Sequence, residues 1–318
     1  MSHDHEIRHL SELDRRKFLK TAGIFSGLVF LNTLAHSAEA DAAAVSLPGF
    51  SAFSKSVKIT KNSKYYLVES NGIPDHQMMV GIKSWQQQIP TVQAYTGANA
   101  WSIPIKPVIS NSPISAKTHF LRGAIALAVN GVPIFNALNN RGDDALLVGE
   151  LDDWGGHCGR ADDYHYHTAP LHLQSIVGKK VPIAYALDGF PIYGETEVNG
   201  KKAVGLDEFN GHFDSKKNYH YHGTKNYPYI NGGFKGVVSE IEGQVDPQAI
   251  TRPFREAGAP LRGALITGLT RTGTDSFDLS YALNGATSHV KYTATLSQVN
   301  IEFIDSSGQS RSETYQRR

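Results

Sequence analysis

Residues 151–167 (LDDWGGHCGRADDYHYH) are repeated, with changes, at residues 206–222 (LDEFNGHFDSKKNYHYH). The two stretches align without a gap at an offset of 55 residues and are identical at eight of seventeen positions. Alternate residues of a β-strand point to the same face, so the two histidines of each Tyr-His-Tyr-His motif are predicted to project together, away from the tyrosines. The pattern predicts two copies of one β unit.

A hairpin pattern precedes each copy. Residues 125–135 read IALAV-NG-VPIF and residues 183–193 read IAYAL-DG-FPIY, at an offset of 58 residues. Asn-Gly and Asp-Gly between apolar runs are strong hairpin signals, because both central residues of a type I′ turn have positive φ. Pro133 and Pro191 cannot donate to a sheet ladder, which predicts return strands at an edge or a bulge. Hairpin and histidine motif together predict a tandem duplication, with the units packed about a pseudo-twofold axis.

The remainder of the chain also favours strands. Residues 65–110 are short apolar segments broken by glycine and proline, and β-branched and aromatic residues return in strand-like runs after residue 252. We therefore predict a mostly β fold with one β-rich domain. The predicted divisions are a small, polar linker over 41–64, the domain over 65–240 with units at about 123–172 and 181–223, and a β extension over 241–318.

The first forty residues have the pattern of an export signal. Residues 14–20 (DRRKFLK) precede an apolar run at 22–34, and Ala38-Glu39-Ala40 has the small residues of a cleavage site. This indicates a twin-arginine signal, with Asp14 where serine or threonine is usual. A membrane anchor is the alternative, but it needs about 20 apolar residues and this run is shorter. We expect the twin-arginine machinery as a partner, a periplasmic or extracellular location, and no stable membrane span after cleavage.

The charge and cysteine content exclude several classes of protein. Lysine and arginine number 31 against 30 aspartate and glutamate, a formal net charge of +1, so no basic surface suggests nucleic acid as a partner. Cys158 is the only cysteine, which rules out an internal disulfide. Its counterpart in the second copy is Phe213, which favours a packing role over a thiolate ligand, with a free thiol as the alternative.

The histidines carry the candidate chemistry. Neutral imidazole binds zinc, copper, nickel or iron, and three imidazoles leave a position open for water or substrate. In each copy the first histidine lies eight residues before the paired ones, across a polar turn that a hairpin would close. The predicted ligands are His157, His165 and His167 in the first copy and His212, His220 and His222 in the second, with His76 as a further candidate.

Acidic and tyrosine side chains are expected around these ligands. Asp152 and Asp207 would orient a ligand histidine or supply an oxygen ligand. Asp162 and Asp163 are expected in a solvated turn, and His172 is expected to be structural. Tyrosines of both motifs would pack on the opposite face from the histidines: Tyr164, Tyr166, Tyr219 and Tyr221.

These ligands predict an exported protein that binds copper or zinc, with iron and manganese as alternatives because twin-arginine export carries folded, already loaded chains. Metal-bound water or copper redox chemistry would make it an enzyme acting on an unknown small molecule. A metal store or sensor is another reading. The alternative of a different class is a non-catalytic module that binds a ligand or partner, with a structural Tyr/His framework and the aromatic, glycine-rich loop around residues 227–234 as its contact surface.

Several of these motifs together resemble the YHYH domain family of exported proteins. They are residues 72–76 (GIPDH), residues 186–194 (ALDGFPIYG), both YHYH motifs, and residues 227–234 (YPYINGGF). The resemblance covers roughly residues 70–238. It implies an extracytoplasmic β-rich domain, and it brings no established activity, so the function has to come from the site.

Overall fold

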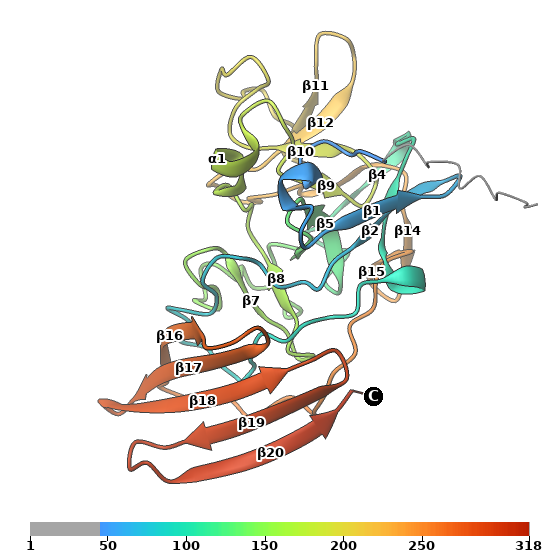
Figure 1. Cartoon of the computed structure of the whole chain (residues 1–318). Helices are drawn as coiled ribbons and strands as arrows, with labels where there is room; N and C mark the ends of the chain where they lie inside the picture. The colour runs from blue at the N-terminus through green and yellow to red at the C-terminus, as the bar shows by residue number, and fades with distance from the viewer. Residues whose placement is uncertain (1–44, 318) are drawn as a thin grey trace, which may run out of the picture. The chain divides into compact units, whose positions relative to one another are not determined.

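The computed structural model describes residues 45–317, and these are mostly β, as predicted (Figure 1). The predicted signal over 1–40 lies outside the described residues. The only α-helix of the described part, α1 (Leu173–Val177), has five residues. Within residues 45–317 no helix has the length and apolar character that crossing a membrane requires.

An eight-stranded sheet contains both repeated units. Its order is β11-β12-β10-β9-β5-β6-β8-β7, so each unit contributes four strands and the two halves run outward from the middle in the same order. The first unit supplies β5 (Ala124–Ala128), β6 (Pro133–Phe135), β7 (Gly156–Cys158) and β8 (Tyr164–Tyr166), and the second supplies β9 (Ala184–Ala186), β10 (Pro191–Tyr193), β11 (Gly211–Phe213) and β12 (Tyr219–His222).

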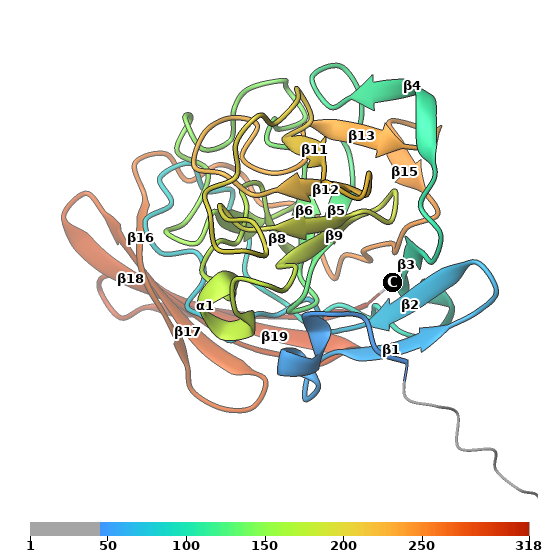
Figure 2. The same cartoon turned by 90° about the horizontal axis from the view of Figure 1, so that it is seen from above.

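The two units meet at the pairing of β5 with β9. These strands are antiparallel, and Leu127 lies opposite Tyr185, which is its own counterpart at the offset of 58. Figure 2 shows the two strands side by side. Every residue of both strands is buried, and most are alanines, which lets other parts of the chain cover both faces closely. The pairing has the form of a twofold axis through the sheet, while a tandem duplication as its origin stays a prediction.

The turns of the repeated hairpins differ from the prediction. Only the glycines, Gly131 and Gly189, have positive φ, whereas Asn130 and Asp188 do not, so the turns are not type I′. The hydrogen bond from Gly189 N to Ala186 O closes a four-residue turn with the glycine at its end, the form of a hairpin with a glycine bulge. The type I′ pattern occurs instead at Asn284-Gly285, where both residues have positive φ.

Pro133 and Pro191 are not in edge strands, which the sequence offered as one of two expected positions. Strands β6 and β10 are interior to the sheet, not at its edge. Pro133 and Pro191 are each the first residue of their strand, where a missing N–H is tolerated.

The predicted linker carries structure from residue 45 onward. It contains η1 (Phe50–Phe53) and β1 (Lys58–Lys61). The Phe50 ring is buried and stacks on Tyr185, with ring centroids 5.8 Å apart, and the Tyr185 hydroxyl donates to the Pro48 carbonyl. A few well-spaced apolar residues therefore cover the central strand, and the polar average composition of the segment concealed them.

Smaller sheets complete the described chain. The C-terminal extension forms a five-stranded antiparallel meander in sequence order, seen in orange and red in Figure 1. Its strand β16 is joined to the domain by backbone hydrogen bonds between Ile266 and the segment at Gly81 and Ile82. The remaining strands and short helices are β2 (Tyr65–Glu69), η2 (Gly97–Asn99), β3 (Trp101–Pro104), β4 (Ile109–Ser115), β13 (Gly233–Gly236), β14 (Ser239–Ile241), β15 (Gln244–Asp246), β16 (Leu265–Arg271), β17 (Ser276–Leu283), β18 (Ala286–Ala294), β19 (Gln298–Ile304) and β20 (Ser310–Gln316).

Replacing Gly189 by alanine should destabilise the protein more than the same change at Gly285. Both glycines have positive φ, which costs alanine about 1–2 kcal/mol. A Cβ at Gly189 would also lie 2.8 Å from the Pro104 carbonyl oxygen, whereas nothing lies within 4 Å at Gly285. We expect the Gly189→Ala variant to lose about 1–3 kcal/mol more free energy of unfolding in urea. Equal losses would show that the close approach to Pro104 is without consequence.

Candidate metal centres

The first histidine cluster is built by the β7/β8 hairpin. His157 lies directly opposite His165 in the antiparallel pair. His167 follows β8, and its N–H donates to the Gly155 carbonyl, which keeps the strand alternation for one more residue. One ring nitrogen from each of the three histidines lies within 4.8 Å of the others. The His157 and His167 Nε2 atoms are 3.0 Å apart.

The second cluster has the same construction in the β11/β12 hairpin. His212 lies opposite His220, their Nε2 atoms are 3.1 Å apart, and His222 completes the group at the end of β12. Two nitrogen ligands on a tetrahedral zinc ion lie about 3.3 Å apart, given metal–nitrogen bonds of about 2.0–2.1 Å. In each cluster one pair of nitrogens is close to this spacing, and the third nitrogen lies within 4.8 Å of both.

A tyrosine and an aspartate hold each hairpin from the opposite face. The Tyr164 hydroxyl crosses behind Gly156 and donates to the Asp152 carboxylate at 2.8 Å. A Cβ at Gly156 would lie 2.5 Å from this hydroxyl, so the position requires glycine. The second copy repeats the arrangement, since Tyr219 donates to Asp207. All four motif tyrosines are buried, as expected for their face.

Asp152 and Asp207 do not orient the histidines, contrary to the prediction. Besides the tyrosine, Asp152 accepts hydrogen bonds from backbone N–H groups, among them those of Trp154 and Gly156 in its own turn. Burial raises its pKa to about 6, although these hydrogen bonds act in the other direction. These carboxylates fix the turn that begins each hairpin, on the tyrosine side of the strand, because a short Asp side chain reaches its own turn first.

Backbone carbonyls orient the imidazoles instead. His167 Nδ1 lies 2.5 Å from the Asn136 carbonyl, and His222 Nδ1 lies 2.7 Å from the Gly194 carbonyl, which is the equivalent position at the offset of 58. His165 Nδ1 lies 3.0 Å from the Asp163 carbonyl. A carbonyl oxygen can only accept a hydrogen bond, so Nδ1 of each of these rings carries the proton. The lone pair of Nε2 is then available to the cluster.

Three of the cluster histidines have a lowered pKa, which favours the neutral form that metal ligation needs. Burial, followed by repulsion from the neighbouring imidazoles, lowers the pKa of His157 well below its ordinary value. Burial lowers the pKa of His167 to about 3 and also lowers that of His222. Among the described residues, His222 Nε2 is fully buried without a hydrogen-bond partner. A buried lone pair of this kind is costly unless an ion or proton donor reaches it.

Glu197 joins the second cluster and was not predicted from the sequence. Its carboxylate oxygens lie 3.0 Å from His212 Nε2, 3.4 Å from His220 Nε2 and 3.5 Å from His222 Nε2. Glu197 comes from the loop after β10, outside the repeated motif. Aligning this loop with residues 136–145 at the offset of 58 was the one signal that could have drawn attention to it.

The two clusters are separate sites. Strands β10, β9, β5 and β6 lie between β12 and β8, and five strand spacings amount to roughly 24 Å. The first cluster borders a cavity of about 260 Å³ and the second a cavity of about 670 Å³. Each group of ligand atoms, three nitrogens in the first and three nitrogens with a carboxylate in the second, could hold a metal ion.

Residues 100–202 match the model of the family described as YHYH protein. This part of the chain is a YHYH domain. The family resemblance seen in the sequence is thereby confirmed over residues 100–202. The match includes the whole first cluster and Glu197, while His212, His220 and His222 lie beyond it. The comparisons with curated proteins and with solved structures gave no match.

His76 does not reach either cluster. It lies on the tyrosine face of the YHYH domain, with its Nε2 2.6 Å from the Tyr166 hydroxyl and its ring stacked on Trp154. Asn130 donates to the same hydroxyl, so Tyr166 donates to His76 Nε2. His172 packs edge-on against His76, which agrees with a structural role for both.

Cys158 is buried beside the first cluster of the YHYH domain and lines its cavity. Burial raises the pKa of its thiol well above the ordinary value, and nearby carboxylates act in the same direction. The thiol therefore stays protonated in the arrangement described, which favours packing over ligation.

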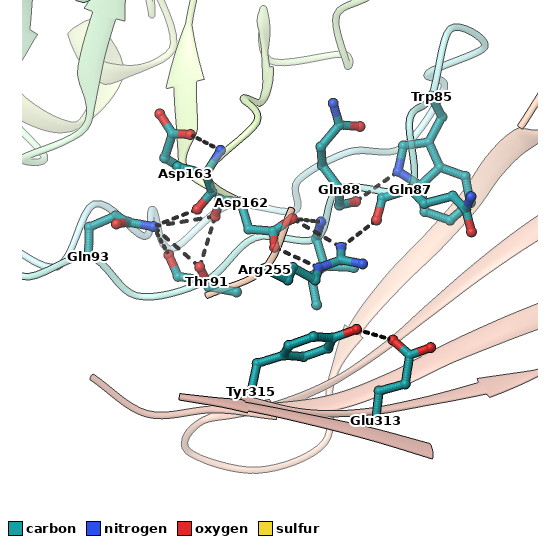
Figure 3. A network of polar contacts seen from close by, with 12 residues as sticks. Trp85, Gln87, Gln88, Thr91, Gln93, Asp162, Asp163, Arg255, Glu313 and Tyr315 are labelled. Carbon is teal, nitrogen blue, oxygen red and sulfur yellow. Dashed lines mark hydrogen bonds and ion pairs between the residues drawn. The ribbon is translucent and has the colours of Figure 1, made fainter. Parts of the chain in front are cut away.

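Asp162 and Asp163, in the turn between His157 and His165, are buried, contrary to the expected solvated turn. Asp162 is 3% exposed, and its carboxylate pairs with Arg255 at 2.9 Å. Figure 3 shows this pair together with Thr91, which donates to the Asp162 carbonyl. The equivalent turn of the second copy, residues 214–218, is mostly exposed. Only the first cluster is thus tied to the segment that leads into the C-terminal sheet.

Replacing Arg255 by methionine should destabilise the fold strongly. The side chains of Arg255 and Asp162 are 9% and 4% exposed, and a buried carboxylate left without its partner costs about 3–5 kcal/mol. Arg311→Met is the matched control, because Arg311 and Glu313 are 66% and 26% exposed and such pairs contribute about 0–1 kcal/mol. Urea unfolding gives both free energies. A loss below 1 kcal/mol for Arg255→Met would contradict the anchoring role.

Proposed function

We propose that this protein is an exported metal-binding protein whose two histidine centres bind copper or zinc. One observation carries the proposal. In each of the two units, the same kind of hairpin brings three imidazole nitrogens within 4.8 Å of one another. The lowered pKa values of His157 and His167 support it, as does the buried Nε2 of His222, which makes no hydrogen bond, because a bound cation would use the lone pairs that burial keeps unprotonated.

The donor atoms support the choice of metal. Three imidazoles, alone or with one carboxylate, are borderline to hard ligands that suit zinc and copper(II), and the carboxylate of the second centre extends the choice to iron or manganese. A copper(I) centre would use thiolate or thioether ligands. The ligand group of the first centre contains three histidines and no thiol, so this centre offers nitrogen only.

The first centre has the form of a reactive metal site. Its three imidazoles face a cavity, and three protein ligands with one open position are the arrangement of catalytic zinc centres, where the metal supplies an activated water. The chain's own part is to hold the imidazoles in fixed tautomers through the Asn136 and Asp163 carbonyls. The second centre, with Glu197 as an additional ligand, is the one suited to structural binding.

Metal content of purified protein tests the proposal directly. We expect two equivalents of metal per chain after incubation with zinc or copper(II) and gel filtration, measured by elemental mass spectrometry. His165→Ala and His220→Ala should each lose one equivalent, and the double variant should lose both. His289→Ala is the control, because His289 pairs with Asp278 on the C-terminal sheet.

Each result has a definite reading. A wild-type protein that stays metal-free would make the histidines a structural framework and would favour the ligand-binding alternative. Unchanged metal content in His165→Ala would remove that residue from the site.

Export by the twin-arginine route can be tested in the signal itself. Changing Arg15 and Arg16 together to lysine keeps the charge but removes the arginine pair. We expect the precursor to accumulate in the cytoplasm, as followed by cell fractionation and immunoblotting. Changing Lys17 and Lys20 to arginine is the matched control and should leave export intact. Normal export of the first variant would refute this route.

A further inference from the structure

The two centres differ at one equivalent position. The loops after β6 and β10 have the same backbone pairing, since Asn139 N donates to Asp143 O and Glu197 N donates to Lys201 O, at the offset of 58. Glu197 therefore corresponds to Asn139. In the second centre this position supplies a carboxylate to the three imidazoles. In the first centre it supplies an amide, which donates a hydrogen bond to the Glu150 carboxylate.

This difference leaves the two centres with different charge. Three neutral imidazoles compensate none of the charge of a divalent ion, and an uncompensated charge near a partly buried cavity is unfavourable. Glu197 supplies one negative charge in the second centre. The ligand group of the first cluster contains histidines only, and the Asp163 carboxylate, which lies 3.5 Å from His165 Nδ1, is not part of it.

The cavity beside the first centre is suited to an anion. Three arginines line it, Arg122, Arg141 and Arg160, against a single carboxylate, Glu150, which is already paired with Arg141. Arg160 is exposed and makes no ion pair within the described part of the chain. Amide side chains supply further donors: Gln86, Gln88, Asn139 and Asn140.

The cavity of the second centre has the opposite character. Glu197 and Asp214 line it, and no lysine or arginine does so among the described residues. An anion would find neither an empty ligand position nor a cationic partner there.

We propose that the first centre binds a small carboxylate or related oxoanion from solution, with one oxygen at the metal in the place that Glu197 takes in the second centre. Arg160, which makes no ion pair within the described part of the chain, holds the remaining charge of the anion at the cavity wall, whereas Arg141 is already paired with Glu150 and Asp143. The cavity of about 260 Å³ limits the ligand to a small molecule, because pockets for drug-sized ligands begin at about 300 Å³. This inference rests on the proposed metal binding, and it gives that centre a substrate class.

The test uses cobalt(II) as a spectroscopic substitute for zinc, since its visible absorption bands change when a ligand exchanges. His220→Ala protein would carry the ion in the first centre only, and His165→Ala protein in the second only. Acetate and phosphate are titrated separately into each protein. We expect a saturable spectral change in His220→Ala for at least one anion and none in His165→Ala. A response to acetate alone identifies a carboxylate site, and one to phosphate a broader oxoanion site.

Two further substitutions in the His220→Ala background test the residues. Asn139→Glu should restore the missing internal carboxylate and abolish the anion response, with one equivalent of cobalt retained. Arg160→Gln should raise the anion dissociation constant at least tenfold without loss of cobalt. Arg311→Gln, on the C-terminal sheet, is the matched control and should change neither value.

The outcomes separate this inference from the proposed function. Cobalt bound at one equivalent without any anion response would overturn the anion site and leave metal binding intact. An anion response that persists in Asn139→Glu would overturn the assigned position. Failure of His220→Ala to bind cobalt at all would overturn both proposals for the first centre.

Discussion

The antiparallel pairing of β5 with β9 is the contact on which the rest of the sheet depends. Leu127 lies opposite its own counterpart Tyr185, so an element that one unit places at its edge of the sheet is placed by the other unit at the opposite edge. The histidine hairpins follow as the outermost strands of each half. Small side chains in β5 and β9 allow this middle to be covered on both faces, and the two histidine clusters lie at the margins of the sheet.

The tyrosines and histidines of each YHYH strand have different roles because successive side chains of a strand point to opposite faces. Tyrosines on one face enter the core and brace the turn through an aspartate, and histidines on the other face meet across the hairpin. The hydrogen bonds that select each tautomer come from backbone carbonyls, which are fixed by the sheet itself. The orientation of His167 and His222 is thus set by main-chain geometry.

The sequence predicts the strands, the hairpins and the six cluster histidines, because alternation and repetition are local signals. It fails where a property depends on distant segments. Asp162 appears as a polar turn residue until Arg255, 93 residues later, is seen against it. Glu197 lies in a loop whose similarity to the first copy is in backbone pairing and not in letters. The buried Phe50 is hidden within a segment that is polar on average.

The Arg255–Asp162 pair has a consequence for the order in which the protein is assembled. All residues of the second centre have been synthesised by residue 222, and its turn needs nothing further. The first centre comes earlier in the chain, yet the turn that holds its histidines is completed only when residue 255 is present. The turn of the first cluster is therefore finished last, so a nascent or truncated chain that ends before residue 255 contains the complete second cluster and a first cluster without its anchor.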